Sequence, residues 1–183
     1  MNLELNNKTA LISGSTKGIG FAIASQLTAE GARVIVNGRS GTAVDAALEQ
    51  IRKDVPQANV EGFAGDLATA TATGDLTKGF PAVDILVNNL GIYEPKAFEE
   101  ITDEDWRRFF EINVLSGVRL SRAYLSGMKR RNWGRIIFIS SESGINTPKE
   151  MIHYGMTKTA QLAVARGLAE HVADLRGAHS GSL

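Results

Sequence analysis

Residues 8–20 read KTALISGSTKGIG. The first six are a short apolar run typical of a buried strand, and Gly20–Glu30 carries apolar residues at helical spacing. The loop between them has glycines at positions 14, 18 and 20, which let the backbone turn sharply and approach an anion closely. A glycine-rich turn that merely links strand to helix is the alternative. The placement between a strand and a helix favours a phosphate-binding loop.

Working outward from this loop, the chain alternates strand-like and helix-like segments. Further strands are predicted at Arg33–Asn37, Asn59–Ala64, Val83–Asn88 and Arg135–Ser140. Helices are predicted at Thr42–Lys53, Thr102–Arg131 and Met151–Leu175, with a short or poorly formed one at Thr69–Gly79. Continuous apolar strands separated by helices predict an α/β fold, a doubly wound, Rossmann-like parallel sheet of about five strands. Such a sheet binds ligands at the carboxyl ends of its strands.

The composition indicates a globular protein. The chain has 183 residues, of which 43% are hydrophobic, so it can build a sizeable core. Twenty basic residues balance twenty acidic ones, which argues against a nucleic-acid-binding protein. Cysteine is absent, which excludes disulfides, thiolate metal sites and a cysteine nucleophile. With no apolar run of membrane length and no signal-peptide pattern, we expect a cytoplasmic protein without a membrane partner.

Three further motifs follow the glycine loop in order. Asn88-Asn89-Leu90-Gly91 comes after the fourth strand, Ser141 follows the fifth, and Tyr154 precedes Lys158 by four positions. Together with the loop, these motifs resemble those of the short-chain dehydrogenase/reductase family, over about residues 6–170. The resemblance implies an NAD(P)-dependent oxidoreductase acting on a small-molecule carbonyl or alcohol. The catalytic tetrad that it implies is Asn113, Ser141, Tyr154 and Lys158. The cofactor contacts that it implies are Gly14, Ser15, Thr16, Lys17, Gly18, Ile19, Gly20, Asn89, Leu90 and Gly91, with Tyr154 and Lys158.

The pair Tyr154 and Lys158 makes chemical sense on one helical face. Reducing a carbonyl requires a proton for the oxygen, and a free phenol, with a pKa of about 10, is a poor base near neutrality. An ammonium one turn away favours the ionised form of a phenol. A hydroxyl of Ser141 can hold the substrate oxygen, and the resemblance implies that Asn113 anchors water and the lysine in a proton relay.

Plainer interpretations remain for each of these residues. The Tyr154–Lys158 pair can be a surface pair, and Asn113 can be a packing residue. Without the family register, Ser141 cannot be chosen over Ser140 or Ser143. For His153, beside the tyrosine, we expect a pocket-lining or surface position rather than acid–base work.

The residues after the second strand bear on the choice of cofactor. NAD-binding proteins of this fold place a carboxylate there, whereas this chain has Gly38-Arg39. Arg39, with Lys17 in the loop, offers cations for a phosphate, so we expect NADP to be preferred over NAD. The alternative is that Arg39 lies in solvent. By resemblance, Asp66 and Leu67 after the third strand contact the adenine, although Asp66 can also be a helix N-cap.

Two departures from the family pattern qualify this prediction. Leu90 stands where the family has alanine, which adds bulk beside the cofactor. The resemblance also implies that the last strands of the family fold are missing, which would leave strand five with an exposed apolar edge. A nucleotide-binding but catalytically weak or inactive truncated homologue is therefore the alternative function, and an unstable product is a third possibility.

The expected organisation is one dinucleotide-binding domain over residues 1–175 and a disordered polar tail over residues 176–183. The two longest helices carry apolar residues on more than one face. In the family such helices commonly pair across subunits, so the resemblance implies a homodimer or homotetramer.

Overall fold

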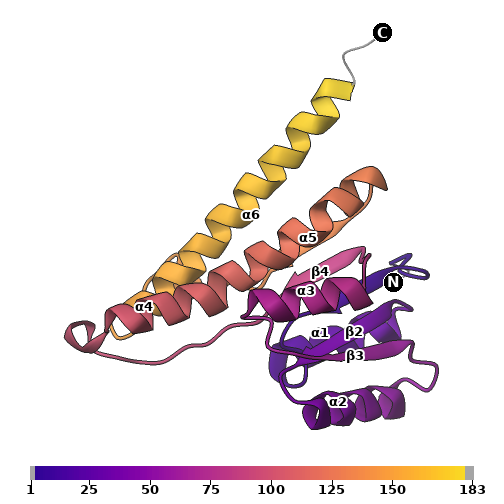
Figure 1. Cartoon of the computed structure of the whole chain (residues 1–183), viewed down its shortest axis with the longest axis horizontal. Helices are drawn as coiled ribbons and strands as arrows, with labels where there is room; N and C mark the ends of the chain where they lie inside the picture. Colours follow the sequence, from indigo (N-terminus) through magenta and orange to yellow (C-terminus); the bar gives the residue numbers. More distant parts are fainter. Residues whose placement is uncertain (1–2, 180–183) are drawn as a thin grey trace.

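The computed structural model describes residues 3–179. Its strands form one parallel five-stranded sheet in the order β3-β2-β1-β4-β5, with helices packed against it (Figure 1). The strands are β1 (Thr9–Ile12), β2 (Arg33–Gly38), β3 (Val60–Ala64), β4 (Ile85–Asn88) and β5 (Arg135–Phe138). The helices are α1 (Gly18–Ala29), α2 (Gly41–Asp54), α3 (Ala70–Gly79), α4 (Asp103–Phe110), α5 (Ser116–Arg130) and α6 (Ile152–His179). Short helical turns are η1 (Phe98–Glu100), η2 (Glu111–Leu115) and η3 (Glu142–Gly144). The predicted doubly wound α/β fold is confirmed.

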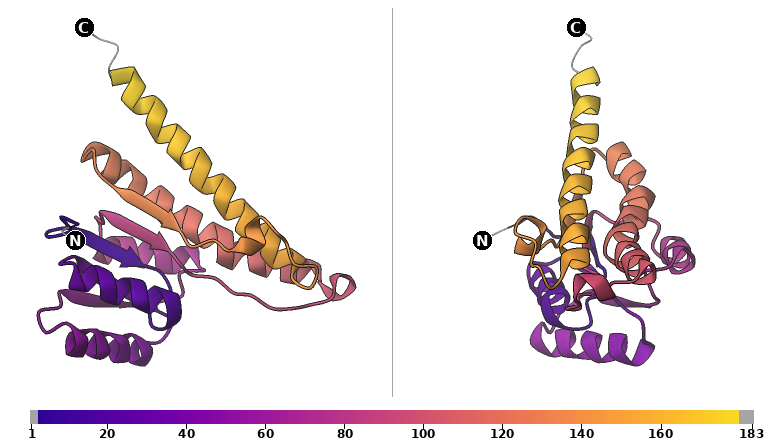
Figure 2. Two further views of the ribbon diagram at one scale, coloured as in Figure 1. Left: turned by 180° about the vertical axis from the view of Figure 1, so that it is seen from behind. Right: turned by 90° about the vertical axis from the view of Figure 1, so that its left-hand side faces the viewer.

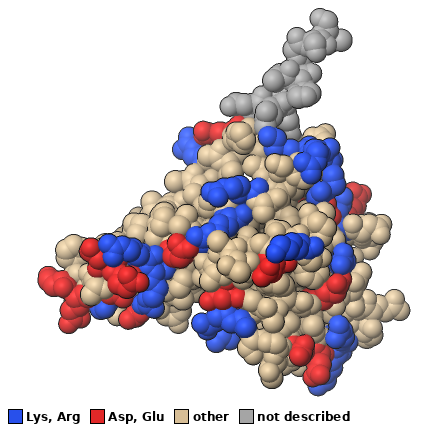
Figure 3. Space-filling view, in the orientation of Figure 1, with Lys and Arg blue, Asp and Glu red and all other residues tan. Residues whose placement is uncertain are grey.

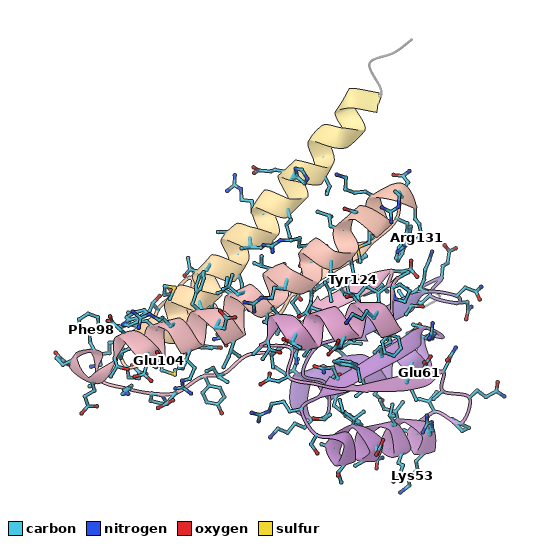
Figure 4. All side chains as sticks on the ribbon, in the orientation of Figure 1. Lys53, Glu61, Phe98, Glu104, Tyr124 and Arg131 are labelled. Carbon is cyan, nitrogen blue, oxygen red and sulfur yellow. The ribbon has the colours of Figure 1, made fainter. Side chains whose placement is uncertain are left out.

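The sheet is covered on both faces because its strands are apolar on both sides. In β1, Ile12 packs with α1 and α2, whereas Leu11 packs on the opposite face with α3 and α5. Tyr124 of α5 also donates its hydroxyl to the carbonyl of Phe80 after α3, at 2.9 Å (Figure 4). The helix predicted as poorly formed, α3, is regular because the Thr69 side chain caps its first turn.

The long helix predicted over Thr102–Arg131 is interrupted. It begins as predicted, with a capping box in which Thr102 and Asp105 satisfy each other's backbone N–H groups. At η2 the helix becomes a π-helical turn, where the Ser116 N–H donates to the carbonyl of Glu111, five residues back. The prediction of one continuous helix was therefore wrong at this turn, which contains Asn113.

The edge of the sheet at β5 is partly uncovered. Ile137, paired with Val87 of β4, is 44% exposed. Its neighbours Ile136 and Phe138 point to the opposite face of the strand, toward α6, which leans away from the sheet as it proceeds (Figure 2). Between α5, β5 and α6 lies a groove of about 960 Å³ whose apolar lining includes Met128, Phe138 and Leu168. The prediction of an apolar edge at the fifth strand is confirmed.

The end of the chain differs from the prediction of a tail. Helix α6 passes the expected boundary at Leu175 and continues to His179, so residues 176–179 are helical. Residues 180–183, the rest of the predicted tail, lie outside the described residues.

Charged side chains of both signs are interspersed on the face shown in Figure 3, in keeping with the balanced composition. Within residues 3–179 no helix is long and apolar enough to cross a membrane. Among the side chains that the structure describes, those of residues 3–173, no group of three or more histidine, aspartate or glutamate residues is placed to hold a metal ion.

Candidate active site

The glycine loop joins β1 to α1 in a conformation that requires glycine. Gly14 and Gly18 have φ angles of +63° and +60°, in the left-handed region that other residues rarely adopt. A Cβ added at Gly20 would lie 2.5 Å from both the Asn89 side-chain nitrogen and the Gly14 carbonyl oxygen. No side chain caps α1 at Lys17, whereas Ser40, Thr69 and Thr102 cap the three helices that follow. The first N–H groups of α1 therefore remain available to an anion.

The loop after β4 is tied to the glycine loop. The Asn89 side-chain nitrogen donates to the carbonyls of Ser13 and Gly14 at 3.0 and 2.9 Å. The backbone N–H groups of Asn89 and Leu90 both donate to the Ser13 hydroxyl at 3.0 Å. Asn89, predicted as a cofactor contact, thus supports the loop with its side chain. Leu90 packs on the α3–α5 side of the core, next to Gly14.

Asn37, at the end of β2, is a second support that the sequence analysis did not single out. Its side-chain oxygen accepts from the Gly14 N–H at 3.0 Å, and its side-chain nitrogen donates to the carbonyls of Phe63 and Gly65. Its own N–H donates to the Ser15 hydroxyl at 2.9 Å. One buried amide therefore joins the ends of β1, β2 and β3. The available signal was a polar residue closing the apolar run RVIVN.

The positions after β2 offer cations and exclude a carboxylate. A Cβ at Gly38 would lie 2.4 Å from the Thr16 methyl group, so this position has no room for a larger side chain. Arg39 and Lys17 are exposed, and neither side chain has a hydrogen-bond or ion-pair partner within residues 3–173, the part of the chain whose side chains are described. This part of the site can therefore receive negative charge.

The two predicted adenine contacts, Asp66 and Leu67, differ in their exposure. Asp66 is exposed, and its carboxylate accepts from the Ala68 N–H at 3.1 Å. The N-cap of α3 is Thr69, so the N-cap interpretation of Asp66 was wrong. The Leu67 side chain is 1% exposed and belongs to the core, which leaves only its backbone for a ligand.

Tyr154 and Lys158 lie on the first turns of α6, facing the end of β5. The Lys158 ammonium lies 5.6 Å from the centre of the Tyr154 ring and donates to the carbonyl of Ile139 at 2.8 Å. Lys158 is 5% exposed, and burial lowers its pKa. The Tyr154 hydroxyl has no partner among the described side chains and backbone of residues 3–173, so it is available to a substrate. The interpretation of this pair as a surface pair was wrong for the lysine.

Asn113 is buried in η2 and holds the loop that follows β4. Its side chain accepts from the Ile92 N–H at 2.8 Å and donates to the carbonyl of Ile92 and to the Thr157 hydroxyl, each at 2.9 Å. A Cβ at Gly91 would lie 3.4 Å from the Asn113 side-chain oxygen and 3.7 Å from the Lys158 nitrogen. The absence of a side chain at Gly91 thus lets the loop after β4 lie close to both Asn113 of η2 and Lys158 of α6.

Two of the three candidate serines, Ser140 and Ser141, are distinguished by their contacts. The Ser140 hydroxyl donates to the carbonyl of Lys158 in α6 at 3.1 Å, so its proton is not free for a substrate. The Ser141 oxygen accepts from the Ser143 N–H at 3.2 Å, which leaves its hydroxyl proton free to donate. Among the residues described, this arrangement is compatible with Ser141 as the substrate donor.

His153 does not lie where it was expected. Its side chain is 0% exposed, with its ring centre 4.0 Å from that of Phe109 and 6.0 Å from that of Trp106. Neither ring nitrogen has a hydrogen-bond partner in the part of the chain that the structure describes. The pocket or surface position was therefore wrong, and His153 is a packing residue between α4 and α6.

Comparison with known protein families identifies a match along most of the chain. The model of the short chain dehydrogenase family matches residues 8–176. "Uncharacterized oxidoreductase YvaG" of Bacillus subtilis is 49% identical over 170 residues, which cover 93% of this chain and 64% of that protein. D-beta-hydroxybutyrate dehydrogenase of Cupriavidus necator is 38% identical over 174 residues, which cover 88% of this chain and 67% of that protein.

The fold has a close counterpart among solved structures. L-sorbose reductase from Gluconobacter frateurii, solved in complex with NADPH and L-sorbose, superimposes with a TM-score of 0.87 at 30% identity. The match covers 95% of this chain and 67% of that chain. The chain described here thus spans about two thirds of the length of the proteins that it matches.

Proposed function

Because the chain belongs to the short-chain dehydrogenase family, we propose that it is an NAD(P)-dependent oxidoreductase that interconverts a small-molecule carbonyl and its alcohol. The observation that carries the proposal is the placement of Gly91 beside Lys158 and Asn113, at the carboxyl ends of the strands. The glycine loop, as the nucleotide site, and Tyr154, as the proton donor, would then lie together at the carboxyl ends of the strands, where such folds bind their ligands.

The glycine loop fits the pyrophosphate of a dinucleotide. Gly14 and Gly18 keep the backbone bare, and the uncapped N-terminus of α1 presents N–H groups and a partial positive charge. Asn37 and Asn89 hold this shape without a ligand, so little ordering is required on binding.

The chain's own residues would handle the proton. A nicotinamide supplies or accepts the hydride at the carbonyl carbon. In the direction of reduction, the Tyr154 hydroxyl donates its proton to the carbonyl oxygen, and the O–H bond of the phenol breaks as that of the alcohol forms. The Lys158 ammonium stabilises the resulting phenolate. The free hydroxyl proton of Ser141 holds the oxygen in place.

The preference for NADP over NAD rests on the end of β2. Thr16 leaves no room for a carboxylate side chain at Gly38, and the exposed Arg39 and Lys17 lack protein partners within residues 3–173. A 2′-phosphate would give these cations a partner.

The second candidate is a nucleotide-binding protein with little or no turnover. The open groove beside β5 favours it, because Ile139, whose carbonyl holds Lys158, directly follows the exposed edge of the sheet. A loosely held lysine would misplace the proton donor, and small misplacements cost large factors in rate.

The wider organisation also remains a proposal. We propose one dinucleotide-binding domain over residues 1–175 that forms a homodimer or homotetramer in the cytoplasm. Half-exposed apolar residues on the helices support self-association, with Phe110 at 39% and Leu162 at 41%. Light scattering at micromolar concentration tests it, and a monomer would contradict it.

Titration with NADPH followed by a panel of carbonyl substrates tests the function. We expect saturable binding and substrate-dependent NADPH oxidation. Tyr154→Phe should lower turnover by about 10²–10⁴-fold, because it removes only the proton-handling hydroxyl, and should leave NADPH binding unchanged.

The matched control is Tyr124→Phe, the same chemical change on α5, away from the site. It should keep its turnover per folded molecule. Binding without turnover in the parent would favour the second candidate, and no binding would contradict both.

A further inference from the structure

One buried polar side chain beside the site is not explained by the function so far. Gln161 is 2% exposed and lies on α6, three residues after Lys158 and seven after Tyr154. This spacing places all three on one helical face. A buried amide on that face needs partners, and Gln161 has two.

The orientation of the Gln161 amide follows from its contacts. Its side-chain nitrogen lies 2.6 Å from the backbone carbonyl oxygen of Asn113. A carbonyl oxygen can only accept, so the NH₂ group must face Asn113. The side-chain oxygen of Gln161 therefore faces the Lys158 ammonium, at 3.2 Å.

The surroundings of Lys158 explain why this oxygen matters. The ammonium is buried and has no carboxylate partner among the side chains of residues 3–173, which the structure describes. Its protein acceptors are the carbonyl of Ile139 and the side-chain oxygen of Gln161. A buried charge without a counter-ion depends on such dipoles for its stability.

We propose that Gln161 is a positioning residue that keeps the Lys158 ammonium charged and directed toward Tyr154, by tethering it to the π-helical turn at Asn113. A carboxamide does not readily give up a proton, so the link is a tether and not a path for protons. It acts beside the proton relay through water and Asn113 that the family resemblance implies. The proposal rests on the proposed function, because it assigns a supporting residue to the same site.

Two substitutions separate this role from simple packing. Gln161→Glu places a carboxylate beside the ammonium and should raise the pH midpoint of Lys158 by about 1–3 units. Gln161→Met keeps the length of the side chain but removes the acceptor. It should lower the midpoint by about 1–2 units, because hydrogen bonds to charged groups are the stronger ones.

The measurement is an NMR titration of protein labelled with ¹³C at the lysine ε-carbons, with Lys158→Met to assign the resonance. It requires no turnover, so it is informative even if the proposed activity fails. Where turnover is present, the limb of the pH–rate profile that reports Lys158 should move in the same directions.

Thr157→Val is the matched control. The Thr157 hydroxyl is the other link between α6 and Asn113, and the described contacts do not join it to Lys158. This variant should lose stability while the Lys158 midpoint stays in place. The proposal is overturned if both Gln161 variants titrate like the parent protein, or if Thr157→Val moves the midpoint as far as Gln161→Met does.

Discussion

At the end of β2, Gly38 has no room for a side chain, and the neighbouring Arg39 has no partner among the side chains described for residues 3–173. We expect Arg39→Ala to weaken NADPH binding by about 10- to 150-fold, because a hydrogen bond to a charged group contributes roughly 1.5–3 kcal/mol. The affinity for NADH, which lacks the 2′-phosphate, should hardly change. Titration of both nucleotides into parent and variant measures the difference.

Arg122→Ala is the control for this comparison, since Arg122 is another exposed arginine but lies on α5. It should leave both affinities unchanged. Equal losses of NADPH and NADH affinity in Arg39→Ala would mean that the arginine supports the loop and does not read the phosphate.

His153 is the residue whose position makes stability depend on pH. Burial against Phe109 and Trp106 lowers its pKa, although the negative charges of Asp105 and Glu94 oppose the shift. As the pH falls below the ordinary pKa of histidine, the unfolded chain therefore takes up a proton at this imidazole while the folded protein still keeps it neutral.

The sign of the effect follows from this difference. The contribution of His153 to the free energy of unfolding is complete above its ordinary pKa, about 6.5, and is lost as the pH falls toward the lower folded value. We expect His153→Phe to flatten the pH dependence of urea unfolding between pH 7.5 and about 5, by up to about 1.4 kcal/mol per unit. His171→Gln, at an exposed histidine of α6, should follow the parent curve. Parallel curves for all three proteins would exclude His153 as the source.

At the scale of the element, the cap of α4 joins three groups. The Thr102 hydroxyl accepts from the Asp105 N–H at 3.2 Å, and the Asp105 carboxylate accepts from the Thr102 N–H and from Lys96. The hydrogen bond from Lys96 is the main reason that the pKa of Asp105 lies well below its usual range. This cap fixes where the helix that carries Phe109 begins.

Removing the cap should therefore be measurable. We expect Thr102→Ala to lower the free energy of unfolding by about 1 kcal/mol in chemical denaturation, the usual loss for an N-cap. Thr71→Ala makes the same change inside α3, at an exposed position, and should stay within about 0.5 kcal/mol of the parent. A Thr102 variant as stable as the Thr71 variant would mean that Asp105 and Lys96 hold the turn alone.

The elements were predictable where one period of apolar residues continues without a break. The strands and most helix ends follow from such runs and from caps such as Thr102. The π-helical turn at η2 was not predictable, because it shifts the backbone hydrogen bonds without changing the composition of the helix. Gln161 was missed because its partner is a backbone carbonyl of that unpredicted turn.

In the site, the motifs identified residues but did not predict which of them support the loops and which remain free to contact a ligand. The chain order placed Asn89 beside the cofactor, yet its side chain holds the glycine loop. Asn37 was missed because four of its hydrogen bonds involve the ends of three strands, and such contacts have no local signature. His153 was misplaced because helical spacing does not tell which helix covers a face.

At the scale of the whole molecule, the uncovered feature is the edge at β5. Ile137 is 44% exposed on a strand that pairs with β4 alone in the described sheet. Exposed apolar strand edges favour association with other strands. We expect Ile137→Lys to reduce concentration-dependent light scattering and the binding of a hydrophobic dye, without loss of secondary structure.

The control is Ile145→Lys, which removes an equally apolar and more exposed side chain, at 78%, from the end of η3. It should leave the scattering unchanged if the strand edge is the cause. Equal effects of the two substitutions would indicate general surface hydrophobicity.

The strand order described above also determines when each strand meets its neighbours during synthesis. β1, β2 and β3 leave the ribosome one after another, and each new strand pairs with the one made just before it. The other edge of β1 must wait for β4, because the sheet grows in the opposite direction after β3. During that interval the nascent chain displays Ala10, Leu11 and Ile12 along an unpaired edge. The time taken to translate the segment between β3 and β4 thus sets how long the centre of the future sheet stays unpaired on that side.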